Sequence, residues 1–562
     1  MRKSIFAIVM GLSALVFPQS IKAEVDPNFY IYLCFGQSNM EGNAQAETMD
    51  QTVDKRFRLL ATCDNKNTNP QRVTGQWYDA KPPLVNSMAG GLGPTDYFGR
   101  TMVAALPSNV RIGVVPVAMG GSPIEMFDKD KYAQKLAQNP NDWWATIAKT
   151  CYGGNPYGRL IEMAKKAQEV GVIKGILLHQ GCSNNGDPNW PNMVKKIYND
   201  MLTDLGLSAD SVPLFVGETL RQENGGSCYG HNVQVNRMPS VVPTSHVISS
   251  EDLPGNGKDT WHFSALGYRM LGKRYAFSAL ELMGKELYAD TAYSMPSAYR
   301  KFYIAKSINI PSSMSAMPGQ SIPATATFND NHKEKISKYL SVNSEDFVYE
   351  NGAFSPKYQG TGTAEVVYKD FLRNEKKVTT QLDIKFLPLK SECLTILKGT
   401  ASFNEADTSF TVKASSQIGW CYDAGADMSD YDYLVLKLKE PITKASCSIR
   451  IYAQNDATSS SYYTKVVGKN DTIVYIDLNN MVRNNKKIKP THIGIVSLYN
   501  TAASTIKIDD IYLTTSESTG ITTIADKKKQ SQHVYDLKGR KMPSNGLRSG
   551  LYLKDGKKVF IK

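Results

Sequence analysis

Short continuous apolar runs alternate with helix-patterned segments over roughly the first half of the chain. Runs rich in Val, Ile, Leu and aromatic residues lie at 29–34, 110–117, 172–178 and 212–216. Continuous apolar strands separated by helices predict a parallel sheet that is covered by helices on both faces. Ser264 precedes a further helical pattern and is expected to cap its N-terminus. Because sites in such sheets form at the carboxyl ends of the strands, we expect the chemistry of the protein there.

The pattern changes after about residue 290, where short strand-like runs are separated by Gly, Pro, Asn and Ser. An immunoglobulin-like β-sandwich at 300–390 is predicted from the runs 303–311, 321–328, 364–368 and 378–386. A second β-sandwich at 391–516 is predicted from the runs 433–438, 447–453, 472–478, 492–498 and 506–513. The segment 517–562 predicts a polar linker followed by compact hairpins. The predicted fold class is therefore an α/β domain at 24–290, two β-sandwich domains and a short β tail.

The first 23 residues have the pattern of a secretory signal peptide. Arg2 and Lys3 precede an apolar stretch at 5–17, and a polar segment ends at Ala23, the expected cleavage point. No other segment approaches the length that spans a bilayer, so no membrane span is expected. The mature protein is predicted to be secreted or held at the cell surface, with the periplasm as a place of transit.

Composition narrows the classes of function. The net charge is +12, but much of the clustered charge lies in the C-terminal part and no recognised binding motif accompanies it, so nucleic acid is not an expected partner. Eight cysteines would permit disulfides outside the cytoplasm, although their spacing assigns no pairing. No His-Glu-x-x-His or Cys-x-x-Cys motif occurs, and the seven histidines are scattered. Neither a metal nor another cofactor is predicted.

The strongest chemical signal is Ser38, which follows the first apolar run and opens a predicted helix. A serine in this position can act as a nucleophile, although Ser and Asn are also common turn and N-cap residues. Far downstream, Asp259 and His262 lie three residues apart, just before the last helix of the α/β pattern. We expect Ser38 to attack an acyl carbonyl, His262 to take its proton and Asp259 to fix the imidazole tautomer. The alternative is that Asp259 and His262 are an ordinary loop pair.

Several donors are expected near the reacting carbonyl. The backbone N–H groups of Ser38 and of Gly120 or Gly121, and the side-chain amide of Gln180 or Asn184, are candidates for an oxyanion hole. Gly120 and Gly121 would equally form a tight turn with no other role. The residues predicted to contact substrate are Gln37, Asn39, His179 and Asn184, although His179 also fits a structural histidine beside the site.

Two sets of aromatic residues would suit a carbohydrate ligand. In the α/β domain, tryptophans in loops or near strand ends would stack on sugar rings or simply pack in the core: Trp77, Trp143, Trp144 and Trp190. In the second sandwich, the candidate platform residues are Trp420, Tyr422, Tyr431, Tyr433, Tyr462 and Tyr463. The second sandwich would therefore be a carbohydrate-binding module or, equally, a spacer.

Four ordered sequence blocks fall at predicted strand ends or before the last helix. They are Gly36-Gln37-Ser38-Asn39-Met40, Met119-Gly120-Gly121-Ser122, His179-Gln180-Gly181 and Asp259-Thr260-Trp261-His262-Phe263-Ser264-Ala265-Leu266-Gly267-Tyr268. These blocks resemble the SGNH-hydrolase superfamily, in its branch of acetylxylan esterases and sialate O-acetylesterases. The resemblance implies a flavodoxin-like three-layer α/β/α fold and a metal-free serine esterase. It also implies that Ser38 is the nucleophile, His262 the base, Asp259 its partner and Gln180 an oxyanion donor.

One residue departs from the pattern of that branch. Cys182 stands in the third block where its members commonly have a glutamate. The loss of an acidic residue beside the site could change how the substrate is oriented or how the loop is ordered. Separately, the C-terminal hairpins resemble the secretion and sorting tails of exported Bacteroidetes proteins, which implies an export machinery as a partner.

The predicted function is a secreted serine carbohydrate O-acetylesterase that acts on acetylated polysaccharide or oligosaccharide. Acetylxylan from plants is the expected substrate, and sialic acid or pectin is the alternative within the same class. A non-catalytic glycan-binding adhesin is the alternative from another class. A lipase or thioesterase would need a long apolar acyl channel, which the Asn-rich surroundings of Ser38 do not suggest.

Overall fold

The computed structural model describes residues 25–88, 90–290, 295–344, 347–443, 446–515, 534–535, 541–542, 550–554 and 557–561. The predicted signal peptide lies outside the described residues. The chain divides into two compact units, Met1–Arg300 and Lys301–Lys562. Within the described part of the chain, no helix is both long enough and apolar enough to cross a membrane.

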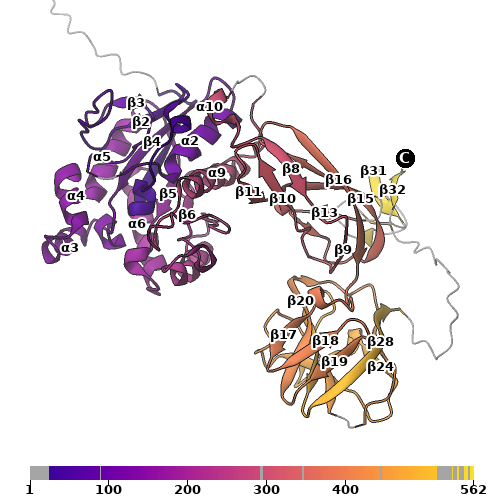
Figure 1. Cartoon of the computed structure of the whole chain (residues 1–562). Helices are drawn as coiled ribbons and strands as arrows, with labels where there is room; N and C mark the ends of the chain where they lie inside the picture. Colours follow the sequence, from indigo (N-terminus) through magenta and orange to yellow (C-terminus); the bar gives the residue numbers. More distant parts are fainter. Residues whose placement is uncertain are drawn as a thin grey trace, which may run out of the picture. The chain divides into compact units, whose positions relative to one another are not determined.

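A seven-stranded sheet forms the centre of the first unit (Figure 1). Its strands are β1 (Phe29–Gly36), β2 (Phe57–Leu60), β3 (Trp77–Asp79), β4 (Arg111–Ala118), β5 (Val172–His179), β6 (Leu214–Gly217) and β7 (Ser245–Ile248). The order is β3-β2-β4-β1-β5-β6-β7, and all neighbours are parallel except β3, which pairs antiparallel with β2. The strands β4-β1-β5-β6-β7 have the flavodoxin-like order, in which the first strand lies inside the sheet. The predicted fold class of this domain is confirmed.

Helices cover both faces of the sheet (Figure 1). On one face, Ile31 of β1 packs in a core cluster with Leu160 of α5 (Pro156–Gln168) and with residues of α6 (Trp190–Leu205). On the other face, the ring of Tyr32 lies 4.7 Å from that of Phe98 in α2 (Pro94–Ala105), which packs beside α9 (Ala265–Leu282). Successive strand residues point to opposite faces, so a strand covered on both sides is apolar throughout. The remaining helices are α1 (Ser38–Glu41), α3 (Tyr132–Gln138), α4 (Trp143–Tyr152), α7 (Asn232–Asn236), α8 (Met238–Val241) and α10 (Ser297–Arg300).

A buried charged cluster joins α2 to α9. The Asp50 carboxylate accepts a hydrogen bond from the Tyr97 hydroxyl at 2.9 Å and pairs with Arg269 of α9 at 2.8 Å. Arg100 of α2 pairs with Asp96 and also donates to the Asp50 backbone carbonyl. All five side chains are buried. Removing one partner of a buried pair typically costs about 3–5 kcal/mol, because the other charge is left uncompensated. The cluster therefore fixes α9, and with it the loop that precedes α9.

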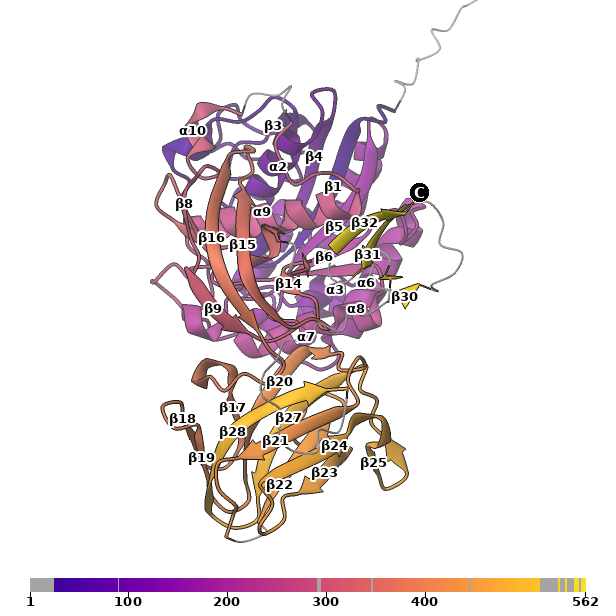
Figure 2. The ribbon, with the colours of Figure 1, turned by 90° about the vertical axis from the view of Figure 1, so that its right-hand side faces the viewer.

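The first part of the second unit contains two antiparallel-rich sheets around a shared core. One sheet has the order β11-β10-β8 and the other β12-β15-β16-β9. The strands are β8 (Ala305–Asn309), β9 (Ser313–Ala316), β10 (Thr325–Phe328), β11 (Lys333–Lys335), β12 (Leu340–Asn343), β15 (Gly360–Lys369) and β16 (Glu375–Ile384), with a small hairpin β13 (Tyr349–Glu350) and β14 (Ala353–Phe354). Figure 2 shows β15 and β16 as a long hairpin. The two layers agree with the predicted β-sandwich.

The next part of the second unit contains two five-stranded sheets, β17-β20-β27-β22-β23 and β18-β19-β28-β21-β24 (Figure 2). Their strands are β17 (Thr395–Lys398), β18 (Ala401–Asn404), β19 (Ser409–Val412), β20 (Ser416–Ala426), β21 (Tyr433–Leu438), β22 (Cys447–Tyr452), β23 (Tyr462–Val466), β24 (Ile473–Asp477), β27 (Ile493–Asn500) and β28 (Ser504–Thr514). A two-stranded pair, β25 (Val482–Arg483) and β26 (Lys486–Lys487), follows β24. The tail forms a small sheet of β29 (Val534–Tyr535), β30 (Lys541–Met542), β31 (Gly550–Lys554) and β32 (Lys557–Ile561). The domain boundaries given above stay predictions.

Candidate active site

Ser38 lies at the carboxyl end of the central strand β1, as the first residue of α1. The turn before it needs Gly36, whose φ is +149° and where a Cβ would lie 2.1 Å from the carbonyl oxygen of His179. The backbone N–H of Gln37 donates to the same carbonyl at 3.1 Å. These contacts hold the turn against the end of β5. The Ser38 side chain consequently faces the rim of the sheet, and 8% of the residue is exposed.

His262 reaches Ser38 from the loop between β7 and α9. Its Nε2 lies 2.8 Å from Ser38 Oγ, and its Nδ1 lies 2.9 Å from Asp259 Oδ2. Ser264 caps α9 as predicted, by accepting a hydrogen bond of 3.1 Å from the Gly267 N–H. The structure therefore brings Ser38, His262 and Asp259 into one continuous hydrogen-bonded chain, although 224 residues separate the first two.

The environment of Asp259 keeps its carboxylate ionised. Its Oδ1 accepts the backbone N–H groups of Trp261 and His262 at 2.8 and 3.0 Å, and its Oδ2 accepts the Asn256 side-chain amide at 2.9 Å. Partial burial raises the pKa of Asp259, but the hydrogen bonds from His262, Asn256 and these N–H groups outweigh it, so the pKa lies well below its usual value. An ionised Asp259 accepts the Nδ1–H of His262, which leaves Nε2 free to accept the proton of Ser38.

Asn39 connects the serine turn to the histidine loop. Its side-chain amide donates to the Trp261 carbonyl at 2.9 Å, and its Oδ1 accepts the Tyr268 hydroxyl at 2.6 Å. Asn39 is 1% exposed. The residue next to the candidate nucleophile therefore fixes both the loop that carries His262 and the helix behind it.

Gly120 lies directly beside Ser38. A Cβ at this position would lie 3.6 Å from Ser38 Cβ and 2.9 Å from Glu41 Oε2, so a larger residue would crowd the site. Burial raises the pKa of Glu41 to about 7, although the Asn86 side chain and the Gly120 backbone N–H lower it in part. Because the Gly120 N–H donates to the Glu41 carboxyl, the expected oxyanion donor from this turn is the Gly121 N–H. Glu41 is a neighbour of the site that the sequence motifs did not indicate.

Gln180 and Asn184 do not take the positions expected of oxyanion donors. Gln180 is fully buried, and its amide nitrogen donates to Asn184 Oδ1 at 2.7 Å and to the Ser122 carbonyl at 3.3 Å. Asn184 in turn donates to Glu125 at 3.1 Å and accepts the Ile124 N–H at 2.9 Å. The structure thus gives both amides a role in joining the Gly120 turn to the end of β5, contrary to the prediction.

Gln37, Asn39 and His179, which are predicted to contact substrate, lie buried beneath the candidate site. All three are at most 3% exposed. Gln37 Oε1 accepts the backbone N–H groups of Gly181 and Ser183 at 3.0 and 3.3 Å. His179 Nε2 lies 2.9 Å from the Glu218 carbonyl, and burial lowers its pKa to about 4. These residues stabilise the segments that form the site. For His179 the observed contacts favour a structural role over contact with substrate.

Two exposed tryptophans lie near the candidate site. Trp143 is 52% exposed, and its Nε1 lies 3.8 Å from the position of a Cβ on Gly120. Trp261 is 50% exposed, and its ring centroid lies 6.4 Å from that of His262. Trp143 is among the tryptophans predicted to contact sugar, whereas Trp261 is not, although it lies inside the block that carries Asp259 and His262. Exposed aromatic rings near a reactive hydroxyl are suited to holding a sugar ring.

The other predicted tryptophans pack in the core. Trp190 is fully buried and its Nε1 donates to Gln180 Oε1 at 2.5 Å. Trp144 is 6% exposed, and Trp77 packs against Phe29 with ring centroids 4.9 Å apart. For these three residues the packing alternative is confirmed.

A polar cavity of about 620 Å³ adjoins Asp259. Its lining residues come from the segment after α1 and from the loop before α9: Asn43, Ala44, Gln45, Ala46, Glu47, Thr48, Asn256, Lys258, Asp259, Ser264 and Ala265. Lys258 is an exposed cation on this lining, whereas Glu47 pairs with Arg269 at 2.9 Å. The cavity is therefore open to a polar ligand and offers it one ammonium group.

Three of the six aromatic residues predicted to form a platform on the second sandwich are buried or lie against cations, whereas Tyr431, Tyr433 and Tyr463 are partly exposed. Trp420 and Tyr422 lie in the core between the two five-stranded sheets, because they alternate along β20 with the outward-facing Cys421. Tyr462 lies between two guanidinium groups, Arg450 at 4.6 Å and Arg483 at 3.8 Å from its ring centroid. A ring that is covered by cations is not available for a sugar.

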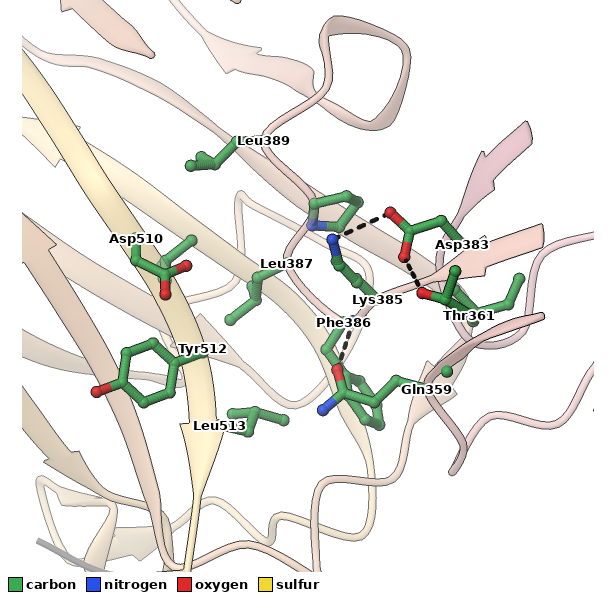
Figure 3. Close-up of a pocket in the computed structure, with 14 residues that line it drawn as sticks. Gln359, Thr361, Asp383, Lys385, Phe386, Leu387, Leu389, Asp510, Tyr512 and Leu513 are labelled. Atoms are coloured by element: carbon green, nitrogen blue, oxygen red, sulfur yellow. Dashed lines mark hydrogen bonds and ion pairs between the residues drawn. The ribbon is translucent and has the colours of Figure 1, made fainter. Parts of the chain in front are cut away.

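A further pocket, of about 450 Å³, lies in the second unit (Figure 3). It is lined by residues of β15, β16, β28 and the segment 385–389. Three of its polar side chains pair with one another: Asp383 accepts the Thr361 hydroxyl at 2.8 Å and pairs with Lys385 at 3.0 Å. Gln359 accepts the Phe386 N–H at 3.4 Å. Within the described residues, the lining contains no serine, cysteine or histidine, so it offers no nucleophile and base for ester chemistry.

Among the residues that the structure describes, one acidic cluster has the spacing to hold a metal ion, and it consists of Asp128, Asp130 and Asp200. The ammonium group of Lys196 lies 2.7–2.8 Å from a carboxylate oxygen of each aspartate. Because this lysine already occupies the place between the carboxylates, the donor set does not fit a resident cation.

The comparisons with known proteins agree with this geometry. Residues 28–281 match the family model of carbohydrate esterases described as sialic acid-specific acetylesterases. The N-terminal domain is a carbohydrate esterase. The match spans the blocks from Ser38 to His262, so the enzyme class of the domain is that of carboxylic ester hydrolases acting on carbohydrate.

Several solved structures are similar to this chain. A protein from Arabidopsis thaliana is 20% identical, and the alignment covers 46% of this chain and 99% of that protein with a TM-score of 0.34. NanS is 15% identical, with 46% and 99% covered and a TM-score of 0.35. A two-domain esterase active on acetylated mannans is 8% identical, with 87% and 92% covered and a TM-score of 0.24.

Proposed function

We propose that this carbohydrate esterase is a secreted serine O-acetylesterase that removes acetyl groups from plant polysaccharide, with acetylxylan as its substrate. The observation that carries the proposal is the chain of hydrogen bonds from Ser38 Oγ to His262 Nε2 (2.8 Å) and from His262 Nδ1 to Asp259 Oδ2 (2.9 Å). A hydroxyl, an imidazole and an ionised carboxylate in this geometry are the parts of a serine acyl-transfer site.

In the proposed reaction, Ser38 Oγ attacks the acetyl carbonyl carbon while His262 Nε2 takes the hydroxyl proton. The resulting imidazolium is stabilised by Asp259, and it then gives the proton to the departing sugar oxygen. Water attacks the acetyl-enzyme with His262 again as the base, which releases acetate and restores Ser38. The backbone N–H groups of Ser38 and Gly121 are the proposed donors to the oxyanion, because the Gly120 N–H already donates to the Glu41 carboxyl. Loss of one such donor typically lowers kcat by about 10²–10³.

The surroundings of Ser38 support a sugar-linked acyl group. The exposed rings of Trp143, close to Gly120, and of Trp261, close to His262, would stack on neutral pyranose rings. The adjoining cavity is polar, which suits a carbohydrate better than a long acyl chain. These features favour a polysaccharide ester over a lipid or thioester.

A second candidate is removal of acetyl groups from sialic acid. Two observations favour it: the description of the matching family model, and Lys258, whose ammonium group lines the cavity next to Asp259. A sialic acid carries a carboxylate that this cation would pair with, whereas the backbone of xylan does not. Replacing Lys258 by Ala should therefore weaken hydrolysis of an acetylated sialic acid and leave neutral xylan unchanged.

The proposal is tested by acetate release from acetylated xylan, with p-nitrophenyl acetate as a small-ester control. Wild-type protein should release acetate from both substrates, and Ser38→Ala should release it from neither. Activity on p-nitrophenyl acetate alone would support the serine mechanism but exclude acetylxylan as the substrate, which leaves acetylated sialic acid or pectin. If wild type hydrolysed no ester at all, the esterase mechanism proposed for Ser38 would be wrong.

We also propose that the protein is exported after removal of residues 1–23, and that the second sandwich acts as a spacer. Export is supported by the leader pattern and by the polymeric substrate, which a cell meets outside its membrane. The spacer role is supported by the burial of Trp420 and Tyr422 and by the cations that cover Tyr462. N-terminal sequencing of the exported protein should begin at Glu24. Residues 391–516 alone should fail to sediment with insoluble xylan, and sedimentation would restore the binding-module alternative.

A further inference from the structure

We propose that Cys182 and Cys228 form a disulfide that braces the two halves of the active site, and that its reduction lowers the esterase activity. The link itself is independent of the reaction, whereas the effect on activity rests on the proposed function. Cys182 is the residue that departs from the third sequence block, so the proposal also gives that departure a structural role.

Cys182 is tied to the turn that carries Ser38. It follows β5 and opens the short 3-10 helix Cys182–Asn184. Its two neighbours, Gly181 and Ser183, both donate their backbone N–H groups to Gln37 Oε1, at 3.0 and 3.3 Å. Ser183 also donates its hydroxyl to the Gly121 carbonyl at 2.9 Å. Any movement of Cys182 is therefore transmitted to the residue before Ser38 and to the Gly120 turn.

Cys228 is tied to the loop that carries His262. Its neighbour Ser227 donates its backbone N–H to the Thr260 carbonyl at 2.9 Å, and the Thr260 hydroxyl donates to Ser227 Oγ at 3.0 Å. Thr260 lies between Asp259 and His262 in the sequence. On its other side, the Cys228 carbonyl accepts the Thr219 hydroxyl at 3.0 Å and the His231 N–H at 3.0 Å. Cys228 thus belongs to the support of the histidine loop.

The two segments meet at these cysteines. A Cβ on Gly181 would lie 2.4 Å from Cδ2 of His231 and 3.0 Å from Cγ2 of Thr219, the two residues that hydrogen-bond to Cys228. The thiols of Cys182 and Cys228 are themselves side-chain hydrogen-bond partners. That contact lowers the pKa of Cys228 to about 7 and raises the pKa of Cys182. Both cysteines are free in the structure, and two contacting thiols are the reduced state from which a disulfide forms.

The chemistry requires an exogenous disulfide as oxidant, such as that of a thiol–disulfide oxidoreductase in an oxidising compartment. One thiolate of the pair attacks a sulfur of the donor disulfide, which breaks the donor S–S bond and releases one donor thiolate. The second thiolate then attacks the mixed disulfide and releases the other donor thiolate. The two cysteines lose two protons and two electrons, and the donor is reduced to a dithiol.

A second pair supplies a matched control. Cys63 and Cys151 both contact the Ser87 hydroxyl, at 3.4 and 3.6 Å, and their thiols are also hydrogen-bond partners. Neither residue contacts the segments that hold Gln37 or Thr260 through the hydrogen bonds described above. A linkage at this second pair would stiffen the domain without joining the two halves of the site.

The test uses the full chain, exported into an oxidising compartment, alkylated without reduction and digested for mass spectrometry. We expect a peptide pair that joins Cys182 to Cys228 and disappears on treatment with dithiothreitol. Recovery of both cysteines in alkylated form would overturn the disulfide. Thermal unfolding of the Cys182→Ser/Cys228→Ser and Cys63→Ser/Cys151→Ser variants shows whether a change in activity comes from a misfolded protein.

The effect on activity is measured with p-nitrophenyl acetate before and after reduction. Dithiothreitol should lower the rate severalfold for wild type and for the Cys63→Ser/Cys151→Ser variant. The Cys182→Ser/Cys228→Ser variant should have the rate of reduced wild type from the start, and dithiothreitol should not change it. If the protein contains the Cys182–Cys228 disulfide but its rate does not change on reduction, the disulfide does not support the active site. A linked protein with no activity before reduction would overturn the proposed function and leave the disulfide standing.

Discussion

The side-chain amide of Asn39 donates a hydrogen bond of 2.9 Å to the backbone carbonyl of Trp261, so the residue next to Ser38 holds the loop of His262 directly. The distance between Ser38 Oγ and His262 Nε2 thus depends on a side chain that has no part in proton transfer. Asn39 is a positioning residue. The predictions below separate such residues from those that act on the ester.

Replacing Ser38 by Ala should lower kcat for p-nitrophenyl acetate by about 10⁴-fold or more, because the attacking oxygen is lost. The thermal unfolding midpoint should change little, since the hydroxyl is at the rim of the sheet. Ser208→Ala, an exposed serine far along the chain, is the matched control and should retain wild-type kinetics. Equal rates for Ser38→Ala and wild type would exclude Ser38 as the nucleophile.

Replacing Asp259 by Asn should lower kcat by about 10⁴-fold while the structure is retained. An amide can present its NH₂ group to His262 Nδ1, which would favour the tautomer that carries its proton on Nε2. That proton would point at Ser38 and prevent the imidazole from acting as base. The pH dependence of kcat/KM measures this change, and an unaltered profile would contradict the assigned role.

Replacing Asn39 by Ala should lower kcat by about 10- to 100-fold, because the histidine loop is no longer held at its distance from Ser38. Tyr268→Phe is the matched control, since it removes the other hydrogen bond of Asn39 and keeps the one to Trp261. It should cost about 1–2 kcal/mol of unfolding free energy and little activity. If both variants lost activity equally, the contact to Trp261 would not be the decisive one.

Replacing Glu41 by Gln should change how stability depends on pH. Burial raises the folded-state pKa of Glu41 from 4.5 to about 7, so the unfolded chain releases this proton first as the pH rises. The wild type should lose about 3 kcal/mol of unfolding free energy between pH 4.5 and 7 through this group, and the loss should be absent in Glu41→Gln. Urea unfolding of both proteins below and above this range measures the difference. Parallel curves would show that Glu41 titrates normally.

Replacing Trp143 or Trp261 by Ala should raise KM for acetylated xylan by roughly tenfold, the scale of one aromatic stacking contact. Hydrolysis of p-nitrophenyl acetate should be unchanged, because that substrate has no sugar ring. The backbone groups of Trp261 that bind Asn39 and Asp259 remain in the alanine variant. An equal loss on both substrates would assign these rings to the structure of the site.

The sequence predicted the sheet and the reacting groups because each leaves a local signal. The apolar run that became β1 is covered on both faces, and Ser264 caps α9 through a hydrogen bond to a residue three positions away. The antiparallel pair of β2 and β3 was missed. Both strands are short, and their pairing depends on contacts between separate segments.

The roles of the amide side chains were not accessible in the same way. Gln180 and Asn184 carry donors suited to an oxyanion, and only the fold shows that Ser122, Glu125 and each other take up those donors. Trp420 and Tyr422 did carry a usable signal. They alternate with polar or small neighbours in a strand, which predicts that both face the core.

The buried cluster of Asp50, Arg100 and Arg269 has a consequence for the timing of activity during synthesis. Ser38 leaves the ribosome early in synthesis. His262 is held next to Ser38 only when α9 packs on α2 and Arg269 and Arg100 bind Asp50. Until that moment the growing polypeptide carries an ordinary alcohol in place of a reactive serine. Hydrolysis therefore reports that the esterase domain has been completed, and a chain interrupted before α9 would be inert toward esters inside the cell that makes it.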